Sequence, residues 1–571
     1  PPLRSSAASD VYKRQYKIQY RVMLSRYRGK TKCNSCNGSR LRADADYVKI
    51  NNKSISEINR MAISDATLFF KALKLNSEDQ KIAKRIIDEI NSRLSYLKDV
   101  GLGYLTMERA SNTLSGGESQ RINLATSIGS SLVGSMYILD EPSIGLHPRD
   151  SLRLIEVLKK LRDVGNSVIV VEHDEEMMKS ADMIIDIGPY AGRHGGEVVF
   201  KGNHSELVKA SKSLTAKYLT GQYKIEVPKV RRKPKDFIII EQAYLHNLQN
   251  ITVKIPLNQI CVVTGVSGSG KSTLIGKILH TFLERFFLTG LVKASHCNDI
   301  KMNFDLVSGV EYINQNPIGK SSRSNPITYT KGYDDIRQLF ASEKHAKAKG
   351  FKPGYFSFNV DGGRCEKCQG EGQLTISMQF MADVHLKCDE CYGKRFKEEV
   401  LEVKFKGKNI SQVLEMTVEE SLDFFNEDNT LCKKIKAKIF ALSEVGLEYV
   451  QLGQASNTLS GGEAQRIKLA SFLSHNKSKQ KKLFIFDEPT TGLHFHDVKK
   501  LIKALQDLVE MGHHVVIIEH HMDIIKSADW ILDLGPEGGD KGGTLVFEGS
   551  PESFVKSKVL SPTKDHLKEY I

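Results

Sequence analysis

The sequence has no long hydrophobic run, only nine cysteines in 571 residues, and fewer acidic than basic side chains. No apolar stretch approaches the roughly 18 residues that span a bilayer, and the N-terminus has no signal-peptide pattern. We therefore expect no membrane-spanning segment. Four of the cysteines have a metal-ligand spacing, which favours a reducing, cytoplasmic compartment over a disulfide-stabilised scaffold.

The shortage of acidic residues leaves a basic chain. Lys and Arg total 82 against 68 for Asp and Glu, so the net charge is +14. This excess favours a polyanionic partner, although a soluble basic protein without one fits the charge equally well. The length predicts three or four domains at about 150 residues each. Residues 1–15 (PPLRSSAASDVYKRQ) look unrelated to the rest of the chain, and we expect them to be a cloning or sequence-assembly artefact.

The most informative feature is an internal repeat. The string SNTLSGGESQRINLA at 111–125 returns as SNTLSGGEAQRIKLA at 456–470. Each copy is followed by the same series of short strings: an apolar run ending in DEP, then GLH, EH, and IGP or LGP. This repetition predicts a duplicated nucleotide-hydrolysing domain. LSGGE resembles a known signature that binds no nucleotide tightly by itself and needs a phosphate-holding loop from a different domain. That resemblance implies an ATP site built across an interface.

Composition and patterning divide the rest of the chain. Residues 16–110 carry a short cysteine-bearing segment and then helices, 111–222 the C-terminal part of the first repeat, 223–236 a cationic linker, and 237–571 the second repeat with an insertion at 294–441. A solvated tether explains the linker more simply than a nucleic-acid contact does. Alternating strands and helices predict a mainly parallel α/β sheet. The expected strands are 237–241, 251–255, 260–264, 483–486 and 515–518, and a helix is expected over 83–100.

The segment GVSGSGKS at 265–272 matches the phosphate-loop pattern GxxxxGK(S/T) between an apolar strand and a helix-compatible segment, as the pattern requires. Backbone N–H groups of such a loop turn toward phosphate oxygens at a helix N-terminus. Lys271 is expected to neutralise the β/γ-phosphates and the Ser272 hydroxyl to bind Mg²⁺. A glycine-rich turn without a ligand is the alternative. The residues assigned to ATP are Gly265, Ser267, Gly268, Gly270, Lys271, Ser272 and Thr273.

An acidic pair ends a buried-strand pattern in each repeat. Asp487 is predicted to hold Mg²⁺, and Glu488 to act as the general base that polarises the attacking water. Asp140 and Glu141 repeat the pair. Gln315, in the string YINQ, is placed to reach the metal and the water.

Two histidines stand at matching places in the duplication, after the strands VVIIE and VIVVE. A lone histidine is usually structural, but the repetition favours a γ-phosphate sensor at His520 and its counterpart His173. His521 aligns with Asp174 in the first repeat. We therefore favour His520 over His521.

Four cysteines form the pattern CxxC-x19-CxxC. Four thiolates at this spacing suit a closed, tetrahedral and therefore structural Zn²⁺ site, and four free thiols are the alternative. The expected ligands are Cys365, Cys368, Cys388 and Cys391. Cys33 and Cys36 form a separate pair without a histidine or further cysteine nearby in sequence. For that pair, metal binding and free thiols both stay open.

Several long strings carry a resemblance to a known family. They are CVVTGVSGSGKSTL, INQNPIGKSSRSNPITYT, GYFSFNVDGGRCEKCQGEG, NTLSGGEAQRIKLA, FDEPTTGLHFHD, ILDEPSIGLHPRD and VVEHDEE. With the four-cysteine pattern, the chain resembles the ATP-binding-cassette (ABC) superfamily and, within it, the UvrA family of excision-repair damage sensors, over nearly everything after about residue 20. The resemblance implies an α/β fold with two ABC-type ATPase units, the first incomplete, helical signature subdomains, and a zinc module inserted in the second.

In that superfamily the signature of one cassette caps the phosphate loop of the other. Here the first signature is LSGGE at 114–118 and the second is LSGGE at 459–463. The resemblance thus implies that Ser115, Gly116 and Gly117 cap one site. That site would contain Lys271, Gln315, Asp487, Glu488 and His520. A second site would combine Asp140, Glu141 and His173 with Ser460, Gly461 and Gly462, but the sequence has only one GxxxxGK(S/T). We therefore expect one site to turn over, and the chain looks like the C-terminal portion of such a protein.

The resemblance also implies an ATP-hydrolysing DNA-damage recognition subunit of nucleotide excision repair, with ATP, Mg²⁺ and Zn²⁺ as cofactors. It would bind damaged duplex DNA, load a UvrB-type subunit and act as a homodimer; the sequence contains no nuclease constellation. The zinc module would help to couple DNA contact to ATP state, and the segment 378–387 would form a hairpin that presents the module to DNA. Lys320 and Arg323 are candidate phosphate contacts. Backbone charge and duplex deformability would be the signals, so binding should fall steeply with salt.

Three alternatives stay open. The ATPase subunit of a membrane transporter is disfavoured by the four-cysteine module and the basic balance. A tandem-cassette factor acting on ribosomes does not need the zinc insertion. A family paralogue used in drug self-resistance is compatible with this sequence.

Overall fold

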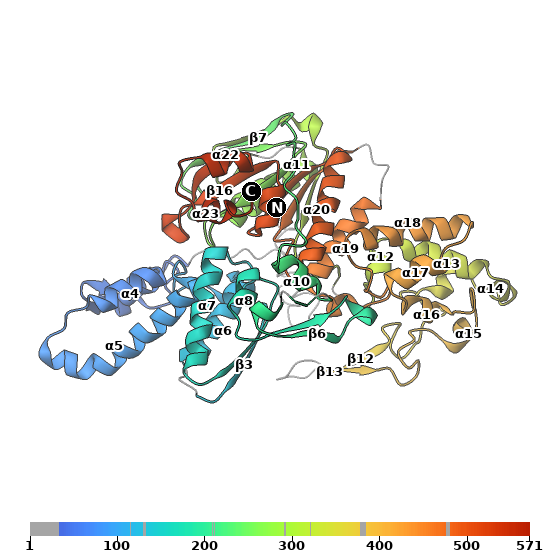
Figure 1. The fold of residues 1–571 in the computed structure, drawn as a ribbon, viewed down its shortest axis with the longest axis horizontal. Helices are drawn as coiled ribbons and strands as arrows, with labels where there is room; N and C mark the ends of the chain where they lie inside the picture. Colours follow the sequence, from blue (N-terminus) through green and yellow to red (C-terminus); the bar gives the residue numbers. More distant parts are fainter. Residues whose placement is uncertain are drawn as a thin grey trace, which may run out of the picture. The chain divides into compact units, whose positions relative to one another are not determined.

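The computed structural model describes residues 33–114, 116–129, 133–207, 209–210, 212–290, 293–319, 321–376, 384–474 and 480–571 (Figure 1). The chain divides into two compact bodies, Pro1–Ser95 with Leu105–Leu114, and Tyr96–Tyr104 with Ser115–Ile571. Residues 1–15, where we expect an artefact, lie outside the described residues, as do Ser115 and Lys320.

The smaller body consists of short helices and one two-stranded sheet. Its elements are η1 (Ala43–Tyr47), β1 (Lys49–Ile50), β2 (Lys53–Ser54), α3 (Ile55–Arg60), α4 (Ile63–Lys71), most of α5 (Ser77–Leu97) and η3 (Ser111–Thr113). Helix α3 begins at a capping box, in which Ser54 and Glu57 each accept a backbone N–H of the other. This reciprocal pairing satisfies two free donors of the first turn. Helix α5 corresponds to the helix expected over 83–100, but it begins at Ser77.

A six-stranded sheet forms the centre of the second repeat. Its members, in spatial order, are β11 (Val310–Ile313), β14 (Leu483–Asp487), β15 (His514–Ile518), β9 (Ile260–Thr264), β16 (Trp530–Gly535) and β17 (Thr544–Gly549). All neighbours are parallel except β16 and β17, so the prediction of a mainly parallel sheet is confirmed. Every residue of β9 and β15 is buried, as expected of central parallel strands covered on both faces.

Two layers cover this sheet. One layer contains the antiparallel strands β7 (Phe237–Ala243), β8 (Ile251–Pro256) and β10 (Asp299–Lys301), and the helix η5 (Thr273–His280), which continues as α11 (Thr281–Thr289). Ile238, Val253 and Leu274 of this layer share a buried cluster with Ile485 and Val516 of the sheet. Because side chains alternate along a strand, the neighbouring sheet residues face a second cluster that includes the apolar side of α20 (Phe495–Glu510).

The region inserted at 294–441 is mostly helical. Apart from β10 and β11, which belong to the sheets described above, its elements are η6 (Phe304–Leu306), α12 (Pro326–Tyr329), α13 (Gly332–Ser342), α14 (Lys344–Ala348), η7 (Pro353–Phe356), α15 (Glu398–Leu401), α16 (Ile410–Leu414), α17 (Val418–Phe424) and α18 (Thr430–Glu444). Strands β12 (Gln373–Ile376) and β13 (Val384–Lys387) pair antiparallel in register Ile376 to Val384. Part of the hairpin expected at 378–387 lies outside the described residues, because 377–383 are not described.

The first repeat contains the counterparts of only part of the second. Its elements are η2 (Lys98–Leu102), α6 (Gly116–Gly129), β3 (Met136–Asp140), α7 (Pro148–Asp163), β4 (Ser167–Val171), α8 (Glu175–Ser180), β5 (Ile184–Gly188), η4 (Gly192–His194), β6 (Glu197–Gly202), α9 (His204–Leu207) and α10 (Leu214–Leu219). Strands β3 and β4 pair in parallel and β5 and β6 antiparallel, as two separate sheets. In the second repeat, β9 joins the counterparts of β4 and β5; within the described residues no strand takes that place in the first.

Apolar side chains on one face of these first-repeat strands are exposed. Ile185 of β5 is 55% exposed, whereas its counterpart Leu532 of β16 is 0% exposed. Ile138 of β3 is 67% exposed and its counterpart Ile485 is 0% exposed. In the second repeat these positions are covered by β7, β8 and η5. The exposed face of the first repeat is therefore the face where, among the described residues, a covering layer is missing.

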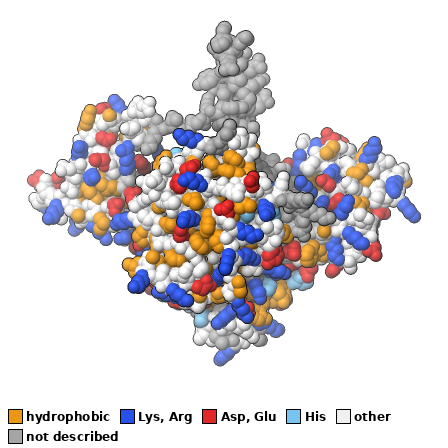
Figure 2. All heavy atoms as spheres, turned by 90° about the horizontal axis from the view of Figure 1, so that it is seen from above, with side chains coloured by type: hydrophobic (Ala, Val, Ile, Leu, Met, Phe, Trp, Pro, Cys, Tyr) orange, Lys and Arg blue, Asp and Glu red, His pale blue; other side chains and the backbone are white. Residues whose placement is uncertain are grey.

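The remaining helices lie near or after the second signature: η8 (Ser456–Thr458), α19 (Gly461–Leu473), α21 (Met522–Ser527), η9 (Gly539–Lys541), α22 (Pro551–Lys556) and α23 (Pro562–Leu567). Within the described part of the chain, no helix is long and apolar enough to cross a membrane. On the face seen in Figure 2, Lys and Arg side chains are scattered among Asp and Glu, so the positive charge is not concentrated there.

Candidate nucleotide site and metal cluster

The phosphate loop lies between β9 and η5. Gly265 has φ +129°, and a Cβ there would lie 1.9 Å from the carbonyl oxygen of Leu534, so only glycine lets β16 back the loop this closely. Lys271 is buried, and its Nζ donates to the carbonyl oxygens of Gly265 (2.9 Å) and Val266 (3.0 Å). Burial lowers the pKa of Lys271 to about 8. The end of the loop leads directly into η5, which begins at Thr273. The remaining residues assigned to ATP binding lie there: Gly270, Ser272 and Thr273.

The acidic pair stands at the end of β14. Asp487 is the last residue of the strand, and Glu488 comes next with φ +48°. The Tyr312 hydroxyl donates to Oδ2 of Asp487 at 2.7 Å. Burial raises the pKa of Glu488 to about 7, helped by the charges of Asp487 and Glu519 and opposed by Lys271. A carboxylate with a pKa near neutrality is suited to accept a proton from water.

His520 and His521 have different environments. His520 is 6% exposed, and its Nδ1 has no hydrogen-bond partner among the described residues. Burial, followed by the charge of Lys271, holds the pKa of His520 well below its usual value, so the ring is neutral. His521 instead caps α21, where its Nδ1 accepts the N–H of Asp523. Its first-repeat counterpart Asp174 likewise caps α8.

Glu519 is a site residue that the sequence reasoning missed. Its carboxylate accepts the backbone N–H of Thr490 (3.0 Å), which lies just after the acidic pair, and of His520 (2.6 Å). In the first repeat, Glu172 accepts the N–H of Ser143 (2.8 Å) in the same way. The signal was present in the sequence, because the EH string recurs in both repeats. Glu519 therefore ties the loop after the acidic pair to the histidine.

Residues upstream of the second repeat lie directly on its phosphate loop. The Tyr104 ring packs against Gly268, where a Cβ would lie 2.7 Å from the ring. The Tyr104 hydroxyl donates to Glu118 of the first signature (2.6 Å). The Ser267 hydroxyl donates to the carbonyl oxygen of Gly145 (3.4 Å) in the first GLH string. The sequence contained a signal for Tyr104, because Tyr449 lies at the equivalent position of the second repeat, and its hydroxyl donates to Glu463 (2.7 Å) in the same way.

The first signature begins next to this contact. Ser115 lies outside the described residues, and Gly116 begins α6. A Cβ at Gly117 would lie 2.6 Å from the carbonyl oxygen of Ile144, the residue before Gly145. The start of α6 therefore packs on the GLH loop that reaches the phosphate loop.

Each GLH loop approaches the acidic pair of the other repeat. A Cβ at Gly145 would lie 2.9 Å from Oε2 of Glu488, and one at Gly492 would lie 3.0 Å from Oε1 of Glu141. Nε2 of His173 is 4.0 Å from Oε1 of Glu141, which comes after Asp140 at the end of β3. The first repeat thus holds its histidine next to the second carboxylate of its acidic pair.

The second signature has a regular helix start. The Ser460 hydroxyl closes a capping box at the N-terminus of α19. A Cβ at Gly461 would lie 3.1 Å from Cβ of Gln315, and one at Gly462 would lie 2.6 Å from the carbonyl oxygen of Thr491. Nε2 of Gln315 donates to the Thr491 hydroxyl (2.9 Å). Gln315 is therefore linked to the loop after the acidic pair and to the second signature.

The four predicted ligand cysteines form one buried cluster. Their sulfur atoms all lie within 4.8 Å of one another, and no other group of three or more candidate ligands occurs in the part of the chain that the structure describes. The Sγ–Sγ distances are 3.9 Å for Cys365 and Cys388, and 3.6 Å for Cys368 and Cys391. A tetrahedral ion with Zn–S bonds of about 2.3 Å requires sulfur atoms about 3.8 Å apart. The donor set thus fits zinc.

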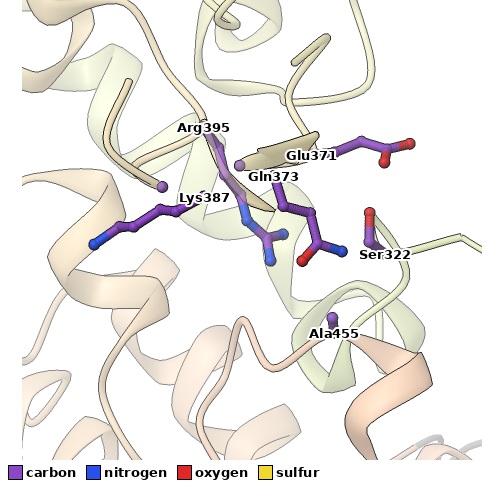
Figure 3. A pocket seen from close by; sticks show the side chains of 8 residues that line it. Ser322, Glu371, Gln373, Lys387, Arg395 and Ala455 are labelled. Atoms are coloured by element: carbon purple, nitrogen blue, oxygen red, sulfur yellow. The ribbon is translucent and has the colours of Figure 1, made fainter. Parts of the chain in front are cut away.

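The four cysteines and the strands β12 and β13 between them form a module. This module contacts the segment before the second signature. The Arg395 guanidinium donates to the carbonyl oxygen of Gly453 (3.2 Å). Arg323 pairs with Glu371 of the module at 3.6 Å. A cavity of about 240 Å³ lies at this junction (Figure 3). It is lined by Ser322, Glu371, Gly372, Gln373, Lys387, Gly393, Arg395 and Ala455.

Comparisons with known proteins agree on one family. No protein-family model matches the chain. It is 51% identical over 555 residues to UvrABC system protein A of Clostridium perfringens, covering 96% of this chain and 58% of that protein. It is 51% identical over 552 residues to UvrABC system protein A of Staphylococcus aureus, again covering 96% and 58%. The crystal structure of UvrA2 from Deinococcus radiodurans superposes with a TM-score of 0.88 at 38% identity, covering 98% of this chain and 68% of that chain. The chain therefore spans little more than half the length of these curated relatives.

Proposed function

The chain belongs to the UvrA family, and from this membership we propose that it is an ATP-hydrolysing, DNA-damage-recognition component of nucleotide excision repair. The fold is that of the ABC ATPases, with a four-cysteine cluster in the second repeat. The proposal extends to binding of damaged duplex DNA and loading of a UvrB-type subunit. A homodimer is part of the same proposal.

One observation carries the proposal: the sequence's single phosphate loop is contacted by both the signature region and the GLH loop of the first repeat. Tyr104 and Glu118 connect the signature helix to Gly268. Gly145 reaches both Ser267 and Glu488. This arrangement supports an ATP site with parts from both repeats, in which Ser115, Gly116 and Gly117 cap the loop.

The proposed roles rest on the positions of the side chains. Lys271 would exchange its two carbonyl partners in the loop for phosphate oxygens. Glu488 would accept the proton of the attacking water, while His520 and Gln315 would contact the γ-phosphate and the water. Ser272 and Asp487 would hold Mg²⁺, which neutralises phosphate charge when bound.

We propose that only this site turns over. Asp140, Glu141 and His173, with the cap at Ser460, Gly461 and Gly462, would form a second site only with a phosphate loop from outside the described residues. The exposed face of β3 and β5 supports this interpretation, because the equivalent face of the second repeat is covered by the elements around the phosphate loop. The division 111–222, 223–236 and 237–571, with the insertion at 294–441, is part of this proposal.

Hydrolysis and binding of ATP by the whole chain test this proposal. Lys271→Ala should abolish hydrolysis, because the phosphates lose their buried cation. Glu488→Gln should keep ATP binding and lower kcat about 100-fold or more, the effect typical of losing a general base. The matched change Glu141→Gln should have a smaller effect on kcat. Two tightly bound ATP per chain, or full hydrolysis by Lys271→Ala, would contradict a single active site.

Binding to duplex DNA with and without a lesion tests the recognition part. The net charge of +14 supports contact with the phosphate backbone, so affinity should fall steeply as salt rises. We expect ATP-dependent preference for the lesion duplex, and we expect Lys271→Ala to remove that dependence. Equal, ATP-independent binding to both duplexes would leave only a generic cassette ATPase.

The four-cysteine cluster is proposed as a structural Zn²⁺ site that holds β12 and β13 against the second signature. Cys365, Cys368, Cys388 and Cys391 leave a tetrahedral ion no open position. Cys33 and Cys36 are more exposed, and no third ligand joins them among the described residues. Metal binding at that pair stays a prediction.

A further inference from the structure

Two chains of hydrogen bonds, which no sequence motif predicted, cross between the repeats. Nε2 of His147, in the first GLH string, lies 3.1 Å from the Thr563 hydroxyl. The Thr563 hydroxyl donates to Oδ1 of Asp533 (3.1 Å) on β16. The Ser561 hydroxyl donates to the other carboxylate oxygen (2.6 Å). All four side chains are buried, so each bond is shielded from water.

A backbone N–H group determines which atom donates at each hydrogen bond of this first series. Nδ1 of His147 accepts the N–H of Arg149 at 3.2 Å. A neutral imidazole that accepts at Nδ1 carries its proton on Nε2, and therefore donates to Thr563. The Thr563 proton then points to Asp533. The series histidine, threonine, aspartate thus has one donor and one acceptor at every link.

The second chain of hydrogen bonds repeats the first with the roles of the repeats exchanged. Nε2 of His494 lies 3.2 Å from the Thr215 hydroxyl, which donates to Asp186 at 3.0 Å. The Ser213 hydroxyl donates to the same carboxylate at 2.6 Å, and Nδ1 of His494 accepts the N–H of His496 at 3.2 Å. Corresponding distances in the two series of hydrogen bonds agree within about 0.1 Å. The same arrangement at both sets of equivalent positions indicates that the duplicated fold forms it twice.

Both chains of bonds lie beside the groups assigned to hydrolysis. The rings of His147 and His520 meet edge to face with centroids 5.9 Å apart, and those of His494 and His173 at 6.5 Å. Asp533 directly precedes Leu534, whose carbonyl oxygen backs the phosphate loop. The first chain of bonds therefore joins the ring facing His520 to the strand that supports the loop.

We propose that Thr563 is a positioning residue for ATP hydrolysis: it fixes His147 of the first repeat against His520 and couples docking of α23 to the phosphate loop. Thr215 does the same for His494 and His173 at the second site. The inference rests on the proposed ATPase function. It adds a connection between the repeats that runs through the C-terminal helix rather than through the signature.

The test compares two substitutions of Thr563 in the full chain, one of them isosteric and the other conservative. Thr563→Val keeps the shape and removes the hydroxyl, whereas Thr563→Ser keeps the hydroxyl. Thr563→Val removes the hydrogen bonds of the hydroxyl to both His147 and Asp533. Loss of the bond to the neutral His147 ring predicts a fall of about three- to tenfold in kcat. We expect KM for ATP to change less than kcat and Thr563→Ser to restore kcat. Equal rates for wild type and Thr563→Val, or equal losses for both variants, would overturn the proposal.

The second chain of bonds supplies a matched comparison. Thr215→Val removes the same hydroxyl next to the site without a phosphate loop, so its effect on kcat should be smaller than that of Thr563→Val. Equal losses would indicate a general packing effect and would overturn the proposed role of Thr563. The thermal midpoint of both variants should fall similarly, because both lose the same pair of hydrogen bonds, one to a histidine and one to an aspartate.

A double-mutant cycle tests the connection without ATP. His147→Gln and Thr563→Val are combined, and the shifts in the urea midpoint are compared. Residues joined by a hydrogen bond give non-additive effects, which we expect here; additive shifts would overturn the connection. If the wild-type chain failed to hydrolyse ATP, the proposed function would fail while this cycle would still decide whether His147 and Thr563 are coupled.

Discussion

Gly145 of the first repeat lies against the Glu488 carboxylate of the second. A Cβ on Gly145 would lie 2.9 Å from Oε2 and 3.2 Å from Oε1 of Glu488. Gly145 also has φ +65°, a conformation that side chains other than glycine rarely adopt. Close approach and backbone shape therefore both require glycine. Gly145 closes one side of the environment that buries Glu488 and raises its pKa.

The first prediction concerns this contact. In Gly145→Ala the new methyl group must displace the Glu488 carboxylate, and kcat for ATP hydrolysis should fall about 10- to 100-fold, as expected when a reacting group is misplaced. Gly492→Ala is the matched control, because its methyl group meets Glu141 at the other site. It should destabilise the chain to a similar degree and lower kcat less. Steady-state hydrolysis and thermal unfolding measure both effects, and equal rates would contradict the prediction.

The second prediction is a bell-shaped pH dependence. Glu488 accepts a proton only when ionised, and burial raises its pKa to about 7, so kcat/KM should rise as the pH increases through about 7. Lys271 binds phosphate only when charged, and burial lowers its pKa to about 8, so kcat/KM should decline above about 8. This ratio reports the ionisations of the free protein. A rising limb near pH 4.5 would contradict the assigned environment of Glu488.

The third prediction concerns metal content. The purified chain should hold about one Zn²⁺, and Cys388→Ser should lose it and unfold at a lower temperature, because the ion links two distant CxxC pairs. Elemental analysis by mass spectrometry measures the stoichiometry. Cys33→Ser is the matched control at an exposed thiol and should keep the full zinc content. A loss of metal in Cys33→Ser would assign a second site to Cys33 and Cys36.

The fourth prediction concerns the ion pair of Arg323 and Glu371. If Arg323 contacts a DNA phosphate, Arg323→Gln should weaken binding to all duplexes and reduce the salt slope by about 1. Glu371→Gln frees the guanidinium and should strengthen binding at low salt. Arg337, paired with Asp334 on its own helix, is the control, and Arg337→Gln should leave affinity unchanged. Fluorescence anisotropy over a salt series measures these effects; an unchanged slope for Arg323→Gln would remove it from the DNA contact.

The fifth prediction compares equivalent strand positions of the two repeats. Leu532→Ser places a hydroxyl in a filled core and should destabilise the chain by about 2–4 kcal/mol. Ile185→Ser changes an exposed counterpart and should alter the free energy of unfolding by less than about 0.5 kcal/mol. Urea unfolding followed by circular dichroism distinguishes the two. Comparable destabilisation would mean that the first-repeat face is covered in solution.

Much of the local structure could be predicted from the sequence. Strands β7, β8, β9, β14 and β15 begin and end within two residues of the expected ranges, because each is a short apolar run or, in β8, an alternation of apolar and polar residues. The start of α5 was missed by six positions, because its first turn, SEDQK, lacks apolar periodicity. Tyr104 and Thr563 were missed although each recurs in the other repeat, as Tyr449 and Thr215, because neither lies inside a motif with a known chemical role.

The sequence by itself determined the phosphate loop, the acidic pair, the cysteine spacing and the duplication. Each of these is a local pattern, in which neighbouring residues carry the chemistry or the backbone shape. Only the tertiary structure decided that Gly145 meets Glu488 and that His147 meets Thr563, 416 positions away. Such contacts depend on how two repeats pack, and packing sums many weak and non-directional apolar contacts that no single motif encodes.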